Sequence, residues 1–491
     1  MNSKKEYEVK IGKLEQEIEK LLKKLKEAQS NCRTKGKELS YLKSEIKRLK
    51  LSRDKWKAKY KMKQEELKQK VKVVTRRGKA KWHHYTTWLI TLCILMRLVG
   101  NCSYEGIAKI VKLLNEYLEL GLPKTPCANS IQNWVSKLGL YVLQIQRVPS
   151  RIGEQVCLIV DESIRLGQEK LLLILSVPFN KLKQAALRYQ DVRVVYMKGA
   201  ISWTGDKISE IIKELEQSHR LEVMYVLSDE DSKLIRACRL SEKVHVPDIS
   251  HGVATCLKRV FEKEEEFVAF RKLVASYSSK GVNQDLSYLC PPKQRTKARF
   301  MNISRVTHWA NSMLENFKKL NEKEQSFFKD LPKQQSFIKV LEECVQLAKA
   351  ISLPFKQNGL TEKALKEAQQ QIEAMKNSEG YLSAFLQQLK EYITRYQQLI
   401  KQFKNIRVHA SSEIIESLFG KYKSKANNYA LTGLTTLNLE LPLYGLSMDQ
   451  IKVYVQQALQ GISIQDLSEW KVKNSSDNQI VKRNDFFKKE K

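Results

Sequence analysis

The sequence has no long apolar run and no closely spaced cysteine pair. The longest apolar run near the N-terminus, residues 88–96, stops at Arg97 and is too short to span a bilayer. The first ten residues contain no signal-peptide apolar region. The nine cysteines are scattered and none belongs to a C-x-x-C pair, which argues against a zinc site or a disulfide framework. We therefore expect a cytoplasmic protein with reduced thiols and no membrane partner.

Negative charge is also scarce beside positive charge. The chain has 87 Lys and Arg against 54 Asp and Glu, a formal net charge of +33. Such an excess implies a polyanionic partner, because each phosphate that Lys or Arg neutralises releases counterions. With a membrane surface disfavoured, double-stranded DNA is the expected partner. The length of 491 residues allows roughly three domains.

Residues 1–80 are predicted to form a basic coiled coil. Apolar residues fall on a heptad repeat from Ile11 to Leu67, with a weak point at Lys35 and Gly36. The segment has 27 Lys and Arg against 11 Asp and Glu, so it holds about half of the excess charge. The pattern fits a solvated helix that pairs protomers, at least as a homodimer. A second interpretation, that the basic faces of this helix also contact DNA non-specifically, is left open by the sequence.

Residues 82–150 are predicted to form a helix-turn-helix-like DNA-binding domain. An amphipathic segment from Ser103 is followed by a Pro- and Gly-rich turn and a second helix, which is the layout of that motif. Ile131, Trp134 and Leu138 are expected to pack inward. The residues expected on the exposed, DNA-binding face are Asn129, Ser130, Gln132, Asn133 and Lys137.

Residues 151–260 are predicted to form an α/β segment. Three strand-like runs are followed by alternating helices and strands, an order that resembles ribonuclease H-like domains. Residues 261–405 show helical periodicity alone and are predicted to be an all-α insertion. Residues 406–450 are expected to complete the α/β core with one more helix. Residues 451–491 are predicted to be a C-terminal helix and a basic tail, disordered beyond about residue 470.

Acidic residues follow the predicted strands at particular points. Asp161 ends the first strand, Asp229 ends the fourth, and Glu416 lies on the helix after the insertion. Converging carboxylates repel each other unless cations neutralise them. Two Mg²⁺ ions about 4 Å apart, with Mn²⁺ as a substitute, neutralise such a cluster and support phosphodiester cleavage. The sequence therefore predicts a catalytic metal site formed by these three acids.

The segments IVDES, VLSDED and EIIESLFGKYK, which contain Asp161, Asp229 and Glu416, together resemble the DDE motif of bacterial insertion-sequence transposases. Glu416 and Lys423 reproduce the E-x6-K spacing of many members, and seven residues place both on one helix face. The resemblance implies a ribonuclease H-like catalytic core, a nucleoid-associated location, and contact of Lys423 with DNA phosphate. In many members a Tyr and an Arg precede the Glu, where this chain has His409 and Ser412.

Each acid has a neighbour that competes for its role. Glu162 adjoins Asp161, but strand alternation points it to the opposite face. Asp231 competes with Asp229, although it can instead cap the following helix. Glu413 competes with Glu416, although an acid in the first helical turn is favoured by the helix dipole alone.

Asp248 is the other candidate for the second metal ligand. It precedes a helix near Ile249 and is interpreted mainly as its N-terminal cap. His251 is expected near the site, where a structural role and a catalytic role both stay open. The choice between Asp248 and Asp229 is left open by the sequence.

Further DNA contacts are predicted in the insertion. A basic loop there can follow the DNA backbone through Lys293, Arg295 and Arg299. In related transposases a Trp of the insertion stacks on a flipped base. The resemblance implies this role for Trp309. The alternative is a core residue, because an aromatic side chain on a helix is more often buried in the core. The chain is thus expected to be a transposase that cleaves and joins DNA. The alternatives are a non-catalytic DNA-binding protein derived from a transposase and a structure-specific nuclease.

Overall fold

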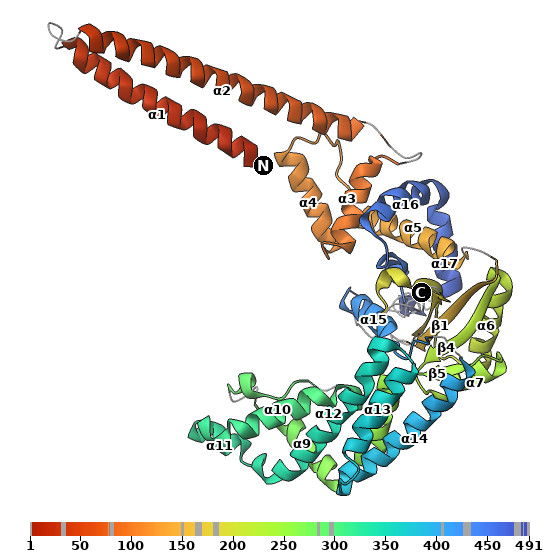
Figure 1. Cartoon of the computed structure of the whole chain (residues 1–491). Coiled ribbons are helices and arrows are strands. Elements are labelled where there is room, and N and C mark those ends of the chain that lie inside the picture. The colour runs from red at the N-terminus through yellow and green to blue at the C-terminus, as the bar shows by residue number, and fades with distance from the viewer. Residues whose placement is uncertain are drawn as a thin grey trace. The chain divides into compact units, whose positions relative to one another are not determined.

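The computed structural model separates into two compact units, Met1–Ile131 and Gln132–Lys491, which are described in turn (Figure 1). Among its described helices, none combines the length and apolarity that crossing a membrane requires. The structure describes residues 2–30, 36–76, 78, 83–148, 152–162, 169–179, 186–281, 285–293, 299–403, 407–425, 434–475, 483–484 and 486–488.

The N-terminal unit begins with two long helices, α1 (Asn2–Ser30) and α2 (Gly36–Arg76), that pack antiparallel. The Tyr60 hydroxyl donates to the Glu8 carboxylate over 2.9 Å, and Lys57 pairs with Glu15 at 2.6 Å. The most buried seam residues are Ile18, Ile46 and Leu49. The predicted break is confirmed, since α2 begins at Gly36. The heptad seam is therefore filled within one chain, and pairing of protomers by this segment stays a prediction.

Two shorter helices follow, α3 (Thr87–Leu98) and α4 (Tyr104–Tyr117). Thr86 and Ser103 cap their first turns, each accepting a hydrogen bond from a backbone N–H of its helix. The Arg97 guanidinium lies 4.4 Å from the Tyr104 ring centroid and so joins the two helices. The next helix, α5 (Ala128–Arg147), begins in this unit and continues into the second. The described part of residues 82–150 is thus a succession of helices, as the sequence predicted.

The second unit is built on a mixed five-stranded sheet in the order β3-β2-β1-β4-β5. Strand β2 is antiparallel to both β1 and β3, whereas β1 with β4 and β4 with β5 are parallel. The runs predicted as strands all form them, and the sheet is confirmed. The strands are β1 (Glu154–Glu162), β2 (Lys170–Pro178), β3 (Arg193–Ala200), β4 (Leu221–Ser228) and β5 (His245–Pro247).

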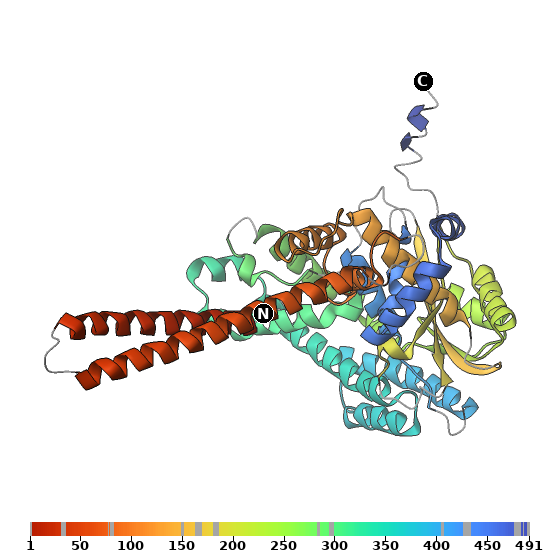
Figure 2. The same ribbon diagram turned by 90° about the horizontal axis from the view of Figure 1, so that it is seen from above.

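The two faces of the sheet bury different partners (Figure 1, Figure 2). Leu158 and Val160 of β1 lie in one apolar cluster with α6 (Gly205–His219) and α7 (Ser232–Leu240). Cys157 and Ile159 face the other way, into a larger cluster that continues through the helical insertion. Alternate residues of β1 therefore belong to different cores, as the period of two in a strand requires.

After β5, helix α8 (Ile249–Phe261) leads into the predicted insertion. Apart from connecting loops and short 3₁₀ turns, the described residues of the insertion are α-helical. Leu360 also forms an isolated β-bridge with Val408, which lies beyond the insertion. The helices pack on α8 and on one another, so their core is continuous with one face of the sheet. They are α9 (Glu265–Lys280), α10 (Ile303–Glu315), α11 (Glu322–Phe328), α12 (Gln335–Asn358), α13 (Glu362–Ala374) and α14 (Gly380–Gln402).

The chain then returns to the sheet through α15 (Glu413–Lys425) and a 3₁₀ segment, Thr436–Leu443. A buried ion pair of 3.1 Å between Lys425 and Glu440 joins these two segments. Two C-terminal helices follow, α16 (Met448–Gly461) and α17 (Ile464–Asn474), where the sequence predicted one. Most of the predicted basic tail lies outside the described residues.

Helix α5 and the 3₁₀ segment approach so closely that only glycine fits between them. A Cβ atom on Gly139 falls 2.0 Å from the carbonyl oxygen of Leu439. We expect Gly139→Ala to lower the free energy of unfolding by about 1–3 kcal/mol, because the backbone of one segment has to move. Thermal unfolding measures this change. Gly420→Ala on α15 is the control, since nothing lies within 4 Å of the added Cβ there, and a loss of stability in both variants or in neither contradicts the prediction.

Candidate functional site

The first two predicted acids lie side by side at the ends of neighbouring parallel strands. Ile159 of β1 is paired with Leu227 of β4, and Asp161 and Asp229 each follow two residues later. Two residues preserve the face of a strand, so Asp161 continues the face of Ile159, which belongs to the larger core. The register of β1 and β4 therefore brings the two aspartates together, as the sequence predicted.

The electrostatics of Asp161 reflect the acids around it. Burial, together with the charges of Asp229 and Glu416, raises the pKa of Asp161 to about 8 against the opposing effect of His251. Burial also raises the pKa of Asp229, again with His251 acting in the opposite direction. These shifts are typical of carboxylates that share a site with too few positive charges.

Helix α15 brings Glu416 to the same place. Its Oε1 atom lies 2.9 Å from Nε2 of His251 on α8. Burial opposes the charge on His251, but the hydrogen bond to Glu416 and the charge of Asp248 raise its pKa to about 9. The raised pKa favours the imidazolium form of His251 beside the acidic cluster, and the hydrogen bond orients Glu416.

Asp248 has the capping role that was its main interpretation. One carboxylate oxygen accepts from the backbone N–H of His251 at 2.8 Å, at the start of α8. The other accepts from the backbone N–H and the hydroxyl of Ser412, at 2.6 and 3.0 Å. Both oxygens are thus in use, which leaves Asp229 as the better-placed second ligand. His409 lies nearby with its backbone N–H bound to the Tyr225 hydroxyl, and burial lowers its pKa to about 4.

The neighbouring acids have partners of their own. Glu162 lies between Lys170 and Lys233, at 2.9 and 2.6 Å. Asp231 caps α7 by accepting from the Lys233 backbone N–H. Glu413 stands in the first turn of α15, as predicted, and pairs with Lys356 of the insertion. These contacts account for the three acids without a role in the cluster.

The cluster opens into a cleft of about 1340 Å³ between the sheet end, α8, α12 and α15. Lys423 lines this cleft with Glu416, as their spacing predicted, and its amine lies 5.5 Å from the Phe419 ring centroid. Lys349 and Lys356 of α12 line it as well, and neither was predicted from the sequence. Nothing in their local sequence indicates this, because the packing of the insertion alone turns them toward the cleft.

The donor chemistry of the cluster fits a hard divalent cation. Asp161, Asp229 and Glu416 offer carboxylate oxygens, the ligands that Mg²⁺ prefers, and the charges of the other two acids contribute, after burial, to the raised pKa of Asp161. The positions of these side chains fit a bound cation less well than their chemistry does. Among the residues that the structure describes, no three His, Cys, Asp or Glu side chains are grouped closely enough to hold a metal ion. Glu416 is held by His251 instead.

The pattern of buried and exposed residues predicted for α5 is confirmed in part, whereas DNA binding by its exposed face stays a prediction. Ile131, Trp134 and Leu138 are buried, as expected. Lys137 is buried too, and burial lowers its pKa, so the prediction that it lies on the exposed face was wrong. Its position on the helix turns it toward the same side as Trp134. The predicted residues that remain wholly or partly exposed are Asn129, Ser130, Gln132 and Asn133.

Trp309 is partly buried and packs against the core of the insertion. Its indole N–H donates to the Leu289 carbonyl oxygen at 2.9 Å, and its ring packs against Tyr277 and Phe328. Because these contacts occupy the ring, the base-stacking role assigned by resemblance is not supported. In the basic loop, Lys293 is exposed, Arg299 is half-buried, and Arg295 lies outside the described residues.

Comparison with known proteins gives no identification. The chain matches no model of a known protein family, and no curated protein matches it in sequence. The case for a function therefore depends on the cleft and its acids.

Replacing Asp161 by Asn is expected to stabilise the protein in the presence of a chelator, because a repelled, desolvated carboxylate is removed. The folded-state pKa of about 8 lies above the ordinary value of 3.8. The wild type therefore loses stability as the pH rises from about 4 to about 8, by at most about 1.4 kcal/mol per pH unit. The advantage of Asp161→Asn grows over that range and then levels off.

Unfolding by urea at several pH values between about 4 and 9 measures this advantage. Asp231→Asn is the matched control, because asparagine caps a helix about as well as aspartate. An advantage that is independent of pH, or that is shared by the control, contradicts the assignment of Asp161 to a repulsive cluster.

Proposed function

We propose that this protein is a DDE-type DNA transposase that recognises the ends of an insertion sequence and catalyses metal-dependent strand cleavage and strand transfer. The observation that carries the proposal is the convergence of Asp161, Asp229 and Glu416 on one cleft. These residues come from β1, the end of β4 and α15, so segments far apart in the sequence supply the cluster.

The sheet topology supports a ribonuclease H-like core. The order β3-β2-β1-β4-β5, with three antiparallel strands followed by two parallel ones, is the order that resemblance to such domains implies. The all-α insertion interrupts this core between α8 and α15. Both features agree with the transposase family that the acidic motif resembles, in which a helical insertion precedes the catalytic Glu.

The three acids are proposed to hold two Mg²⁺ ions, which activate the attacking oxygen and stabilise the leaving oxygen of a phosphodiester. His251 positions Glu416 through their hydrogen bond. Lys423, two helical turns beyond Glu416, lines the same cleft, which supports a role for it in binding a DNA phosphate. Water first breaks a P–O bond at the element end, and the released 3′-OH then attacks target DNA, so each step exchanges one phosphoester bond without a covalent enzyme intermediate.

The charge of the chain supports double-stranded DNA as the partner. The net charge of +33 attracts a polyanion, and Lys349, Lys356 and Lys423 line the cleft around the acids. Cutting and joining two element ends together requires at least a homodimer. A cytoplasmic, nucleoid-associated location in a bacterium follows from the same proposal.

A non-catalytic DNA-binding protein is the second candidate. The hydrogen bond between His251 and Glu416 favours it, because Glu416 has to leave this partner or share it before it binds a metal ion. A structure-specific nuclease on the same fold would cut branched DNA without joining ends. The assay below separates these three functions.

The proposal predicts end-specific nicking and joining of DNA that carries the flanks of the protein's own coding region, in the presence of Mg²⁺. Asp161→Asn, Asp229→Asn and Glu416→Gln are each expected to lower this activity by at least about 10²-fold, because each removes charge from the metal site. Gel analysis of labelled DNA ends measures cleavage and joining separately.

Glu413→Gln is the control for this assay, since Glu413 lines the same cleft one turn away but pairs with Lys356. It is expected to retain most activity. Binding without cleavage supports the non-catalytic candidate, and cutting of branched DNA without joining supports the nuclease. Full activity in any of the three acid variants shows that the triad was assigned wrongly.

Lys423→Ala is expected to weaken DNA binding and to lower the slope of log K against log salt by about 1, because one phosphate contact is lost. Lys421→Ala is the matched control, since Lys421 lies on the same helix with its amine 4.1 Å from the Tyr189 ring centroid and does not line the cleft. Fluorescence anisotropy at several salt concentrations measures both. An equal change in the two variants contradicts a specific role for Lys423.

A further inference from the structure

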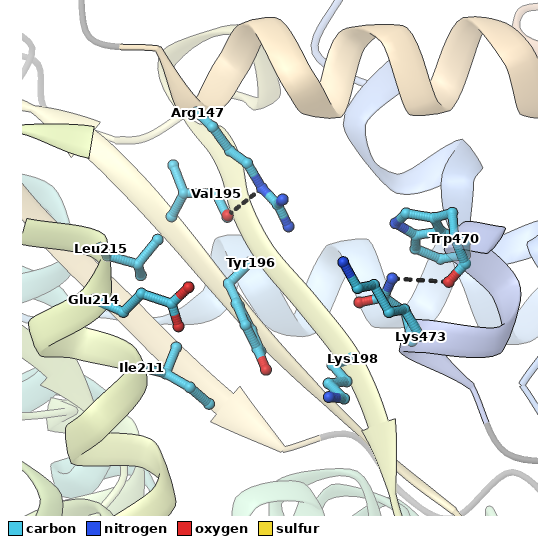
Figure 3. A pocket seen from close by; sticks show the side chains of 10 residues that line it. Arg147, Val195, Tyr196, Lys198, Ile211, Glu214, Leu215, Trp470 and Lys473 are labelled. Atoms are coloured by element: carbon cyan, nitrogen blue, oxygen red, sulfur yellow. Dashed lines mark hydrogen bonds between the residues drawn. The ribbon is translucent and has the colours of Figure 1, made fainter. Parts of the chain in front are cut away.

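A second cavity, of about 390 Å³, lies against strand β3 in the second unit (Figure 3). The end of α5, strand β3, helix α6 and helix α17 form its walls. Its volume is in the lower part of the range of small-molecule sites. None of the residues of the acidic cluster lines it.

Three basic side chains line this cavity, against one acid. They are Arg147, Lys198 and Lys473, and the acid is Glu214. Figure 3 shows Arg147 and Lys473 reaching from α5 and α17 into the same space. The Arg147 guanidinium makes one hydrogen bond, from Nε to the Val195 carbonyl oxygen at 2.9 Å. That bond orients the guanidinium and leaves its terminal N–H groups available.

These cations form no ion pair within the part of the chain that the structure describes, although the nearby charge of Glu214 acts on Arg147. Neither Lys198 nor Lys473 forms an ion pair there, and Arg147 forms none with Glu214. The Nε1 atom of Trp470, a buried side chain that lines the cavity, also has no hydrogen-bond partner. An unpaired buried donor costs free energy unless a ligand or water accepts from it.

The wall formed by α6 is mainly apolar. Ile211 and Leu215 lie there on either side of Glu214, and the Tyr196 ring stands between them and Lys473, whereas Val195 lies beside Arg147. One end of the cavity thus suits an anionic group with several acceptor oxygens, whereas the other suits a carbon skeleton. A phosphate is a multivalent acceptor for Arg and Lys, and its ester group supplies the less polar part.

We propose that this cavity binds the phosphate group of an organophosphate of nucleotide size. Arg147, Lys198 and Lys473 hold the phosphate oxygens, and the Trp470 N–H donates a further hydrogen bond. The phosphate belongs either to a free mononucleotide or to a DNA strand. The same side chains would recognise the phosphate group in both cases. The proposal does not depend on the catalytic function of the acidic cluster.

Isothermal titration of the full chain at low salt with adenosine monophosphate tests the proposal, with adenosine as the probe that lacks phosphate. We expect saturable binding of the monophosphate and at least about tenfold weaker binding of adenosine. Lys198→Ala and Lys473→Ala are each expected to weaken monophosphate binding by about tenfold. Trp470→Phe keeps an aromatic ring but removes the N–H, and is expected to weaken it severalfold.

Lys213→Ala is the matched control, because Lys213 is exposed on α6 beside Glu214 and does not line the cavity. Equal affinity of the wild type and the two lysine variants overturns the proposal, as does equal affinity for adenosine, or no binding of the monophosphate. Thermal unfolding of each variant without ligand separates lost binding from lost folding.

A short single-stranded oligonucleotide added in competition distinguishes the two sources of the phosphate. Displacement of the monophosphate in the wild type supports a DNA strand as the natural occupant. Retention of the monophosphate supports a free nucleotide. Either result agrees with recognition of a phosphate by this cavity. If the oligonucleotide displaces the monophosphate equally well in the wild type and in the Lys198→Ala and Lys473→Ala variants, the two lysines do not hold the phosphate and the proposal is contradicted.

Discussion

The arrangement of the cleft depends on the carboxylate of Asp248. One of its oxygens caps α8, and the other holds Ser412 immediately before α15, across 164 residues of sequence. This buried group therefore fixes the helix that carries His251 and the helix that carries Glu416 relative to each other. The Tyr392 hydroxyl donates to the Asp248 backbone carbonyl oxygen, which ties the insertion to the same point. Together with the buried apolar side chains of α15, this junction sets the position of the third acid beside β1 and β4.

The parts that sequence alone predicted are those with a local physical cause. Alternation placed Asp161 and Glu162 on opposite faces, and the small polar positions before helices identified Asp231 and Asp248 as caps. The strands and the helical insertion follow from hydrophobic periodicity in the same way. A few neighbouring residues are enough to specify these features, which is why they could be predicted from the chain.

The parts that sequence could not predict depend on packing between distant segments. The burial of Lys137 arises from tertiary neighbours that its local pattern does not indicate. The same holds for Lys356, which reaches the cleft only because α12 lies beside α15. The heptad seam of the N-terminal helices was recognised, but periodicity does not say whether its partner is another chain or the same one.

The position of α15 after the insertion has a consequence for synthesis on the ribosome. The five strands and α8 emerge well before Ser412, so the ribosome adds 164 residues after Asp248 before it supplies the donors that satisfy the second oxygen of that carboxylate. A product that terminates within the insertion keeps both aspartates at the sheet edge but lacks Glu416. The acidic cluster is therefore completed late in translation, and truncated chains carry an incomplete one.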